Sequence, residues 1–425
     1  MWEKISRLWK LKDLRNKILF VLGLLIIFRL AAHIPIPGVD INNLRNFFSN
    51  NQFLGMLNIF TGGALENFSI VTLGVGPYIT ASIIFQLLIS IVPKLEELSK
   101  EPDGQKKMNQ YMRLLTVPLA IAQSYATITL LQKSGQGIIG TMSPIQLITS
   151  IVLITGGSIF LMWIGELITE KKVGNGTSLI IFAGIVARIP KTLQQILATF
   201  DPAKIPLIVI FIIIAIITIV GIVFITEAQR NIPVSYARQI RGNRVYGGMT
   251  THLPLRVNQA GVIPIIFAVS LVLLPPLIGQ FIVASASGVI RDAAQFVVTL
   301  FNNQIFYGAI YFLLVFVFTY FYTAVIFHPD QIAENLQKQG GFIPGIRPGK
   351  LTASYLKQVS NRILLAGAAF LGVIAILPLI LKGVGGNGFS SMAIGGTSLL
   401  IVVSVAIETV KQVQSQLTVR DYDNF

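Results

Sequence analysis

The sequence predicts an all-α integral membrane protein with ten transmembrane helices and both termini in the cytoplasm. Three observations lead to this prediction. The chain is 53% hydrophobic and 12% charged, and its mean hydropathy of +0.72 is too high for an ordinary soluble surface. Apolar stretches long enough to cross a membrane alternate with polar connections. Basic residues gather in every second connection.

The apolar stretches define the predicted spans. A helix needs about 20 mostly apolar residues to cross a hydrocarbon core of about 30 Å. Ten such stretches occur, at residues 18–36, 71–92, 114–131, 145–168, 177–189, 205–226, 260–283, 305–327, 363–381 and 392–410.

The charge distribution sets the predicted orientation. The chain has 33 Lys and Arg against 18 Asp and Glu, a net charge of +15. With a cytoplasmic amino terminus, few basic residues fall in outer connections, and Arg29 lies near the outer end of the first span. The outer ones are Arg45, Lys133, Arg188, Lys191, Lys204, Arg291 and Lys382. The positive-inside rule therefore explains most of the basic excess, which could otherwise indicate nucleic acid or anionic lipid as a partner.

The second span is interrupted. Gly62 and Gly63 precede a short, weakly amphipathic piece, and Gly74, Gly76 and Pro77 break the chain before the apolar helix begins. Non-helical backbone at membrane depth is tolerated only inside protein or beside a water-filled cavity. One interpretation is a half-inserted short helix inside a pore. The other is a re-entrant or surface loop followed by a kinked helix. Weaker signals of the same kind start the fifth, seventh and tenth spans, where Thr177 and Ser178 could cap the fifth.

Two connections on the predicted cytoplasmic side, residues 227–259 and 328–361, are about thirty residues long where short turns are the norm. We expect both to project into the cytosol. At the amino terminus a basic segment precedes an apolar one, as in a secretory signal, but no small-residue cleavage site follows, so the segment is expected in the mature protein.

The residues and motifs that several kinds of chemistry require are absent from the sequence. The chain has no cysteine, three scattered histidines and no HExxH, GxSxG or GxxxxGK[ST] motif. We therefore expect no metal site, no cofactor and no enzymatic activity. A secondary transporter of a small solute is the alternative function, because transporters also use broken helices. Ion coupling usually needs acidic residues at mid-membrane, whereas Glu166, Glu227 and Glu408 fall near cytoplasmic helix ends.

Five segments resemble the signature blocks of the SecY family, in the same order and at matching topological positions. They are FTGGALENFSIVTLGVGPYITASII, GELITEKKVGNGTSLIIFAGIV, THLPLRVNQAGVIPIIFA, GFIPGIRPG and GGTSLLIVV. The resemblance runs from about residue 18 to 414. It implies two pseudo-symmetric inverted halves, residues 1–190 and 191–425, around an hourglass pore in the cytoplasmic membrane. It also implies a channel that translocates unfolded preproteins and inserts membrane segments laterally.

The resemblance assigns residues to a plug and a pore ring. The plug, a short helix within about residues 62–73, comprises Gly63, Ala64, Leu65, Glu66, Asn67, Phe68, Ser69, Ile70, Val71 and Thr72. The ring comprises Val75, Ile79, Thr177, Ile181, Ile266 and Ile401. Branched apolar side chains offer ions no hydrogen bonds, so a narrow ring can dewet and still fit loosely around a polypeptide. Thr177 departs from the expected aliphatic residue, and its hydroxyl could bond the backbone one turn earlier.

The resemblance also places a lateral gate between the second and seventh spans, with Gln86 and Asn258 as polar members. It assigns docking of partners to four arginines on the two long connections, Arg238, Arg241, Arg244 and Arg347. The implied partners are SecE-type and SecG-type small membrane subunits, the SecA motor ATPase, and the ribosome with its RNA. Signal sequences, unfolded polypeptides and the lipid bilayer complete this set.

Overall fold

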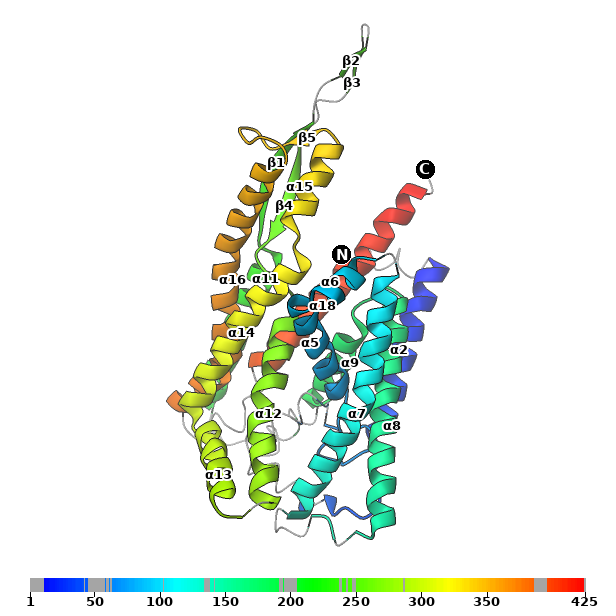
Figure 1. Ribbon diagram of the computed structural model, residues 1–425, viewed down its shortest axis with the longest axis vertical. Helices are drawn as coiled ribbons and strands as arrows, with labels where there is room; N and C mark the ends of the chain where they lie inside the picture. The colour runs from blue at the N-terminus through cyan, green and yellow to red at the C-terminus, as the bar shows by residue number, and fades with distance from the viewer. Residues whose placement is uncertain are drawn as a thin grey trace. The chain divides into compact units, whose positions relative to one another are not determined.

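The computed structural model describes most of the chain in long helices (Figure 1). The described residues are 11–41, 43–44, 58, 61, 63–101, 103–133, 138–140, 142–190, 194, 205–236, 239–241, 244–246, 250–285, 287–385 and 396–423. Their helices are α2 (Lys12–Ala31), α5 (Gly76–Ile91), α6 (Pro93–Lys100), α7 (Gly104–Lys133), α8 (Pro144–Glu170), α9 (Gly176–Val186), α11 (Ile205–Glu227), α12 (Ile263–Ser285), α13 (Val289–Asn302), α14 (Gln304–Ile326), α15 (Pro329–Lys338), α16 (Lys350–Gly385) and α18 (Gly396–Asp423).

Each of the ten predicted spans overlaps one of these helices. In the described part of the chain, seven helices are long and apolar enough to cross a membrane, and an eighth is added if a bent pair counts as one span. That pair is α5 and α6, bent by 108°. α9 is apolar but has only 11 residues. The all-α membrane architecture is confirmed, whereas the number ten stays a prediction.

The interruption of the second span lies where the sequence predicts it. α5 begins at Gly76 with Pro77 in its first turn, a position where proline loses no helical hydrogen bond. Gly74, just before it, has a φ of +57°, which is strained for any residue with a Cβ. The 108° bend at the other end of α5 was not predicted. It coincides with Val92 in extended backbone and Pro93 at the start of α6.

The chain forms two compact units. Unit 1 contains residues 1–206, 269–307 and 401–425, and unit 2 contains residues 207–268 and 308–400. The division into halves at residues 190 and 191 follows the pseudo-symmetry that the resemblance implies, and it stays a prediction.

Unit 1 has an apolar core between α7, α8 and the segment that follows α2. Buried side chains from α7 (Ile128, Leu131) and α8 (Ile154) meet Leu65 and Phe68, which precede α5. α8 starts with a capping box, in which Ser143 and Gln146 satisfy each other's backbone N–H groups. The helices therefore pack closely around the segment before α5, and this apolar packing site is called the seat below.

Unit 2 joins the two long connections in one small sheet, which the sequence analysis did not predict. β1 (Gln229–Tyr236) pairs antiparallel with β4 (Thr250–Arg256), and β5 (Gly341–Phe342), from the second connection, pairs with the other edge of β1. β2 (Gln239–Arg241) and β3 (Arg244–Tyr246) form a separate ribbon beyond β1 and β4. Figure 1 shows the sheet beside α15 and the first part of α16. Its strand order is β4-β1-β5.

A hydrophobic cluster fixes this sheet to the helices. Ile232 and Val234 of β1 and Leu255 of β4 pack with Ile343, which follows β5, and with Leu356 of α16. The two connections are therefore a folded extension of unit 2 and not separate loops.

Candidate functional site

The predicted plug is a chain of turns, and the prediction of a short helix there is wrong. Hydrogen bonds three residues apart recur, from Phe68 N to Leu65 O, Thr72 N to Ser69 O and Gly74 N to Val71 O, but they do not continue into helix. Gly63 and Phe68 have φ values of +82° and +42°. Residues in the left-handed region cannot propagate a right-handed helix, so the backbone turns repeatedly instead.

The plug segment is deeply buried in unit 1. Phe68, Ser69, Val71 and Thr72 have no exposed surface. A short antiparallel bridge ties the segment to the end of the first span, because Ile36 N donates to Phe68 O at 2.9 Å and Ile70 N donates to Ile34 O at 3.1 Å. The segment is therefore held by a few backbone bonds and by apolar packing.

α8 approaches the plug segment at a glycine. A Cβ added to Gly157 would lie 2.0 Å from the carbonyl oxygen of Ile70. Only glycine permits this contact between helix and plug backbone. At the adjacent Gly156, an added Cβ meets nothing within 4 Å.

One ion pair accompanies the apolar seat. Arg188, just after α9, donates from Nη2 to Glu66 Oε2 at 3.3 Å. Asn58 donates from Nδ2 to the same carboxylate oxygen at 3.0 Å and accepts from the Glu66 backbone N–H at 3.0 Å. The side chains of Glu66 and Arg188 are 18% and 32% exposed. Partial burial reduces the screening of this pair by water.

Neither Arg188 nor Asn58 was predicted from the sequence as a contact of the plug segment. Arg188 was counted only as a basic residue of an outer connection, and Asn58 stood in a polar loop with no distinguishing pattern. Arg188 contacts Glu66 across 122 positions of the sequence, and Asn58 contacts it across eight, so no local motif encodes either role.

The predicted ring residues are mostly buried. Val75, Ile79, Ile181, Ile266 and Ile401 are each no more than 9% exposed, and Thr177 is partly buried. Ile266 belongs to unit 2 and the other five belong to unit 1. Convergence of the six side chains around one constriction stays a prediction.

Thr177 does not make the backbone contact that the sequence suggested. Its hydroxyl donates to Asn175 Oδ1 at 2.6 Å, and the same oxygen accepts from Ser178 N at 3.1 Å. The cap of α9 is thus Asn175, and the prediction that Thr177 and Ser178 cap this helix is wrong.

The two predicted gate residues share an unusual feature. Gln86 Nε2 donates to Ser82 Oγ at 3.2 Å, and Asn258 Nδ2 donates to Gly261 O at 3.2 Å. Within the described residues, the buried oxygen of each amide has no hydrogen-bond partner. A buried acceptor without a donor costs about 1–3 kcal/mol. Gln86, on α5, and Asn258, in the segment that precedes α12, therefore each have an amide oxygen that could accept from another donor.

The structure describes three of the four predicted docking residues. Arg238 lies outside the described residues. Arg241 and Arg244 face each other in the register of β2 and β3. Arg347 is exposed in a turn between Gly345 and Gly349, which have φ values of +84° and +96°. Its carbonyl accepts from Thr352 Oγ1 at 2.9 Å, so the backbone that presents it is fixed.

No group of three or more His, Asp and Glu side chains in the described ranges could hold a metal ion.

Comparison with known proteins identifies the family. The SecY family description matches residues 69–410. Protein translocase subunit SecY of Mycobacterium bovis is 46% identical over 97% of both chains, and that of Streptomyces coelicolor is 44% identical over the full length of both. A solved protein conducting channel covers 94% of this chain and 91% of its own, with 18% identity and a TM-score of 0.63.

A second solved structure, Sec61 in the canine ribosome-channel complex, covers 94% of this chain and 91% of its own, with 18% identity and a TM-score of 0.61. A transporter of small solutes gains no support from these matches. With a family match over most of its length and relatives similar from end to end, this multi-pass membrane protein belongs to the SecY family.

Proposed function

We propose that this chain is the pore-forming subunit of a protein translocation channel. It conducts unfolded preproteins across the cytoplasmic membrane and releases apolar segments sideways into the bilayer. One observation carries the proposal: a buried, non-helical segment interrupts the second span and rests in a seat made by its own unit.

Such a segment suits a removable stopper. Irregular backbone at membrane depth is stable only inside protein, and here Phe68, Val71 and their neighbours fill an apolar seat. The packing leaves one polar group unsatisfied. The buried Ser69 hydroxyl has no hydrogen-bond partner among the described residues. A segment held by packing and a few polar contacts can leave when an incoming chain competes for its place.

The ring chemistry supports passage of many sequences. Val75, Ile79, Ile181, Ile266 and Ile401 offer only aliphatic surface, which makes no hydrogen bond with ions or water. Aliphatic contact is also indifferent to the sequence of the passing chain. Gln86 and Asn258 would form the polar seam of the lateral gate. Their spare amide oxygens could accept hydrogen bonds of about 0.6–2 kcal/mol, weak enough for a signal helix to displace.

The sequence has no GxxxxGK[ST] phosphate-binding motif, so we expect the energy for transport to come from partners. We infer that the sheet of unit 2 and the exposed Arg347 are the docking platform for a SecA-type motor and for the ribosome. Ribosome-bound relatives of the same fold support this inference. Arginine suits both partners, because its planar guanidinium pairs with phosphates and with carboxylates. SecE-type and SecG-type subunits would complete the channel.

Reconstitution tests the function directly. Vesicles that contain the purified protein and its SecE-type subunit are expected to import a signal-bearing preprotein when SecA and ATP are supplied. Import is followed as protection from external protease, and omission of ATP is the control. Uptake of a small solute down an ion gradient, without preprotein import, would contradict the proposal and favour a secondary transporter.

A further inference from the structure

A short non-helical segment, residues 257–262, joins β4 to α12 in unit 2. It carries Asn258, and the first turn of α12 that follows carries Ile266. Ala260 and Val262, in the same segment, are 3% and 2% exposed. Buried backbone outside helices and strands needs other attachments, and here α16 supplies them.

The first attachment is through the backbone. Val257 N donates to Ala228 O at 2.9 Å, which ties the start of the segment to the residue before β1. On its other side, the Val257 carbonyl lies against α16, because a Cβ added to Gly367 would be 2.8 Å from that oxygen. A glycine in α16 is what lets the segment come so close to this helix.

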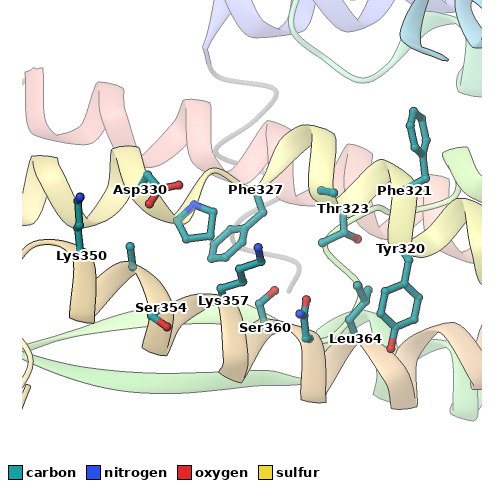
Figure 2. A pocket seen from close by; sticks show the side chains of 14 residues that line it. Tyr320, Phe321, Thr323, Phe327, Asp330, Lys350, Ser354, Lys357, Ser360 and Leu364 are labelled. Atoms are coloured by element: carbon teal, nitrogen blue, oxygen red, sulfur yellow. The ribbon is translucent and has the colours of Figure 1, made fainter. Parts of the chain in front are cut away.

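The second attachment is through side chains. Gln259 Nε2 donates to Ser360 Oγ at 3.3 Å, across 101 positions of the sequence. Ser360 is 3% exposed and precedes Gly367 by about two helical turns, so both residues lie on one face of α16. Figure 2 shows Ser360 on this helix between Lys357 and Leu364, among the side chains that line a cavity of unit 2.

The two attachments flank Asn258, the predicted gate residue. Its Nδ2 donates to Gly261 O at 3.2 Å, and Gly261 has a φ of +66°, a conformation that glycine adopts readily where the chain turns into α12. Within the described residues, the Asn258 amide oxygen has no hydrogen-bond partner. The contacts of Val257 and Gln259 with α16 therefore determine where this oxygen is presented.

The Ser360 contact can be removed without releasing α16. Among the described residues, Gln259 Oε1 has no hydrogen-bond partner, so the amide is held there through Nε2. α16 is anchored independently, since Leu356, one turn before Ser360, packs with Ile232 and Val234 of the small sheet. Loss of the Ser360 hydroxyl would therefore loosen the segment and leave the helix in place.

We propose that Gln259 and Ser360 are positioning residues of the lateral gate, through which α16 holds Asn258 in its resting place. This role rests on the proposed function of the chain, in which a signal helix must displace the gate. A side-chain hydrogen bond between membrane helices shifts an equilibrium by about 3- to 30-fold. The bond therefore helps to exclude signal sequences that are too weakly apolar to open the gate.

The test compares the import of two preproteins into vesicles that contain the protein and its SecE-type subunit, supplied with SecA and ATP. One preprotein has an intact signal, and the other has a polar residue in the apolar core of its signal. Ser360→Ala is expected to raise import of the second preprotein about fivefold and to leave import of the first nearly unchanged. Gln259→Met is expected to do the same, and the double variant to do no more, because both changes break one bond.

Ser354→Ala is the matched control. Ser354 lies on the same helix, is exposed, and lines the cavity in Figure 2. Loss of its hydroxyl is expected to leave import of both preproteins unchanged.

A second measurement does not require transport. Amide hydrogen exchange of residues 257–262 in the detergent-solubilised protein is expected to be several-fold faster in Ser360→Ala and in Gln259→Met than in the wild type. In Ser354→Ala the exchange is expected to be unchanged.

Three results would overturn the positioning role. They are unchanged exchange in Ser360→Ala, additive effects of Ser360→Ala and Gln259→Met on import, and an equal effect of Ser354→Ala. Failure of the wild type to import either preprotein would refute the proposed function and the gate role with it. The exchange measurement would then still decide whether Ser360 holds the segment.

Discussion

At the scale of single residues, the plug segment depends on two contacts of different character. The first is the ion pair between Glu66 and Arg188, supported by Asn58. The second is the close approach of Gly157 to the Ile70 carbonyl. The ion pair adds a charged attachment to an otherwise apolar seat. The glycine allows the seat to be tight. Each contact can be changed without touching the pore ring.

Glu66→Gln is expected to loosen the plug. A hydrogen bond to a charged group contributes about 1.5–3 kcal/mol, and partial exposure places this pair near the lower end. The resting channel should then leak ions about tenfold more, measured as conductance in planar bilayers. The exchanged pair Glu66→Arg with Arg188→Glu is expected to restore most of the seal. An equally leaky exchanged pair would show that the carboxylate acts without Arg188.

Gly157→Ala is expected to unseat the plug or to strain α8. The new methyl would overlap the Ile70 backbone, and overpacking of this kind costs about 1–3 kcal/mol. Thermal unfolding should occur several degrees lower, and resting conductance should rise. Gly156→Ala is the control, because its methyl enters open space and alanine favours helix. If both variants behave alike, the contact does not hold the plug.

At the scale of elements, the sequence predicts helices well and the small sheet poorly. Each of the ten apolar stretches overlaps a helix, because burial in lipid requires a continuous run of apolar residues. β1 alternates only in part, and its pairing with β5 joins residues about 105 positions apart. The plug is a similar case, since its glycines indicate a break but not the turns that replace the expected helix. Contacts between residues far apart in the sequence determine both the pairing of the sheet and the turns of the plug segment.

The sheet gives Arg347 a rigid support, and this has a testable consequence. Arg347→Glu is expected to reduce SecA-driven import by about 30-fold, the effect of reversing one central arginine in an interface. Thermal unfolding should not change, because the side chain is exposed and its turn is held through the backbone. Lys338→Gln, on the nearby α15 and paired with Glu334, is the control and should keep full import. Retained import by Arg347→Glu would remove this residue from the docking surface.

At the scale of the whole molecule, the family assignment and the buried ring residues lead to one geometric expectation. Side chains from α5, α9, α12 and α18 should converge where a translocating chain passes. Sequence could nominate these residues only through family resemblance, because buried aliphatics of a pore and of a core look alike in composition. Within unit 1, the side chains of Val75, Ile79, Ile181 and Ile401 are buried. Their meeting across the two units must be tested by chemistry.

The absence of cysteine makes that test clean. Single cysteines at Ile79 and Ile181 are expected to form cross-links with a cysteine in a stalled translocating polypeptide, because both positions would touch the chain at the constriction. Ile213→Cys is the control. It lies on α11 with half of its surface exposed, on a helix whose apolar face is open to lipid, and it should not react with the substrate. Cross-linking at Ile213 alone, with none at Ile79 or Ile181, would place the polypeptide outside the proposed ring and refute the pore assignment.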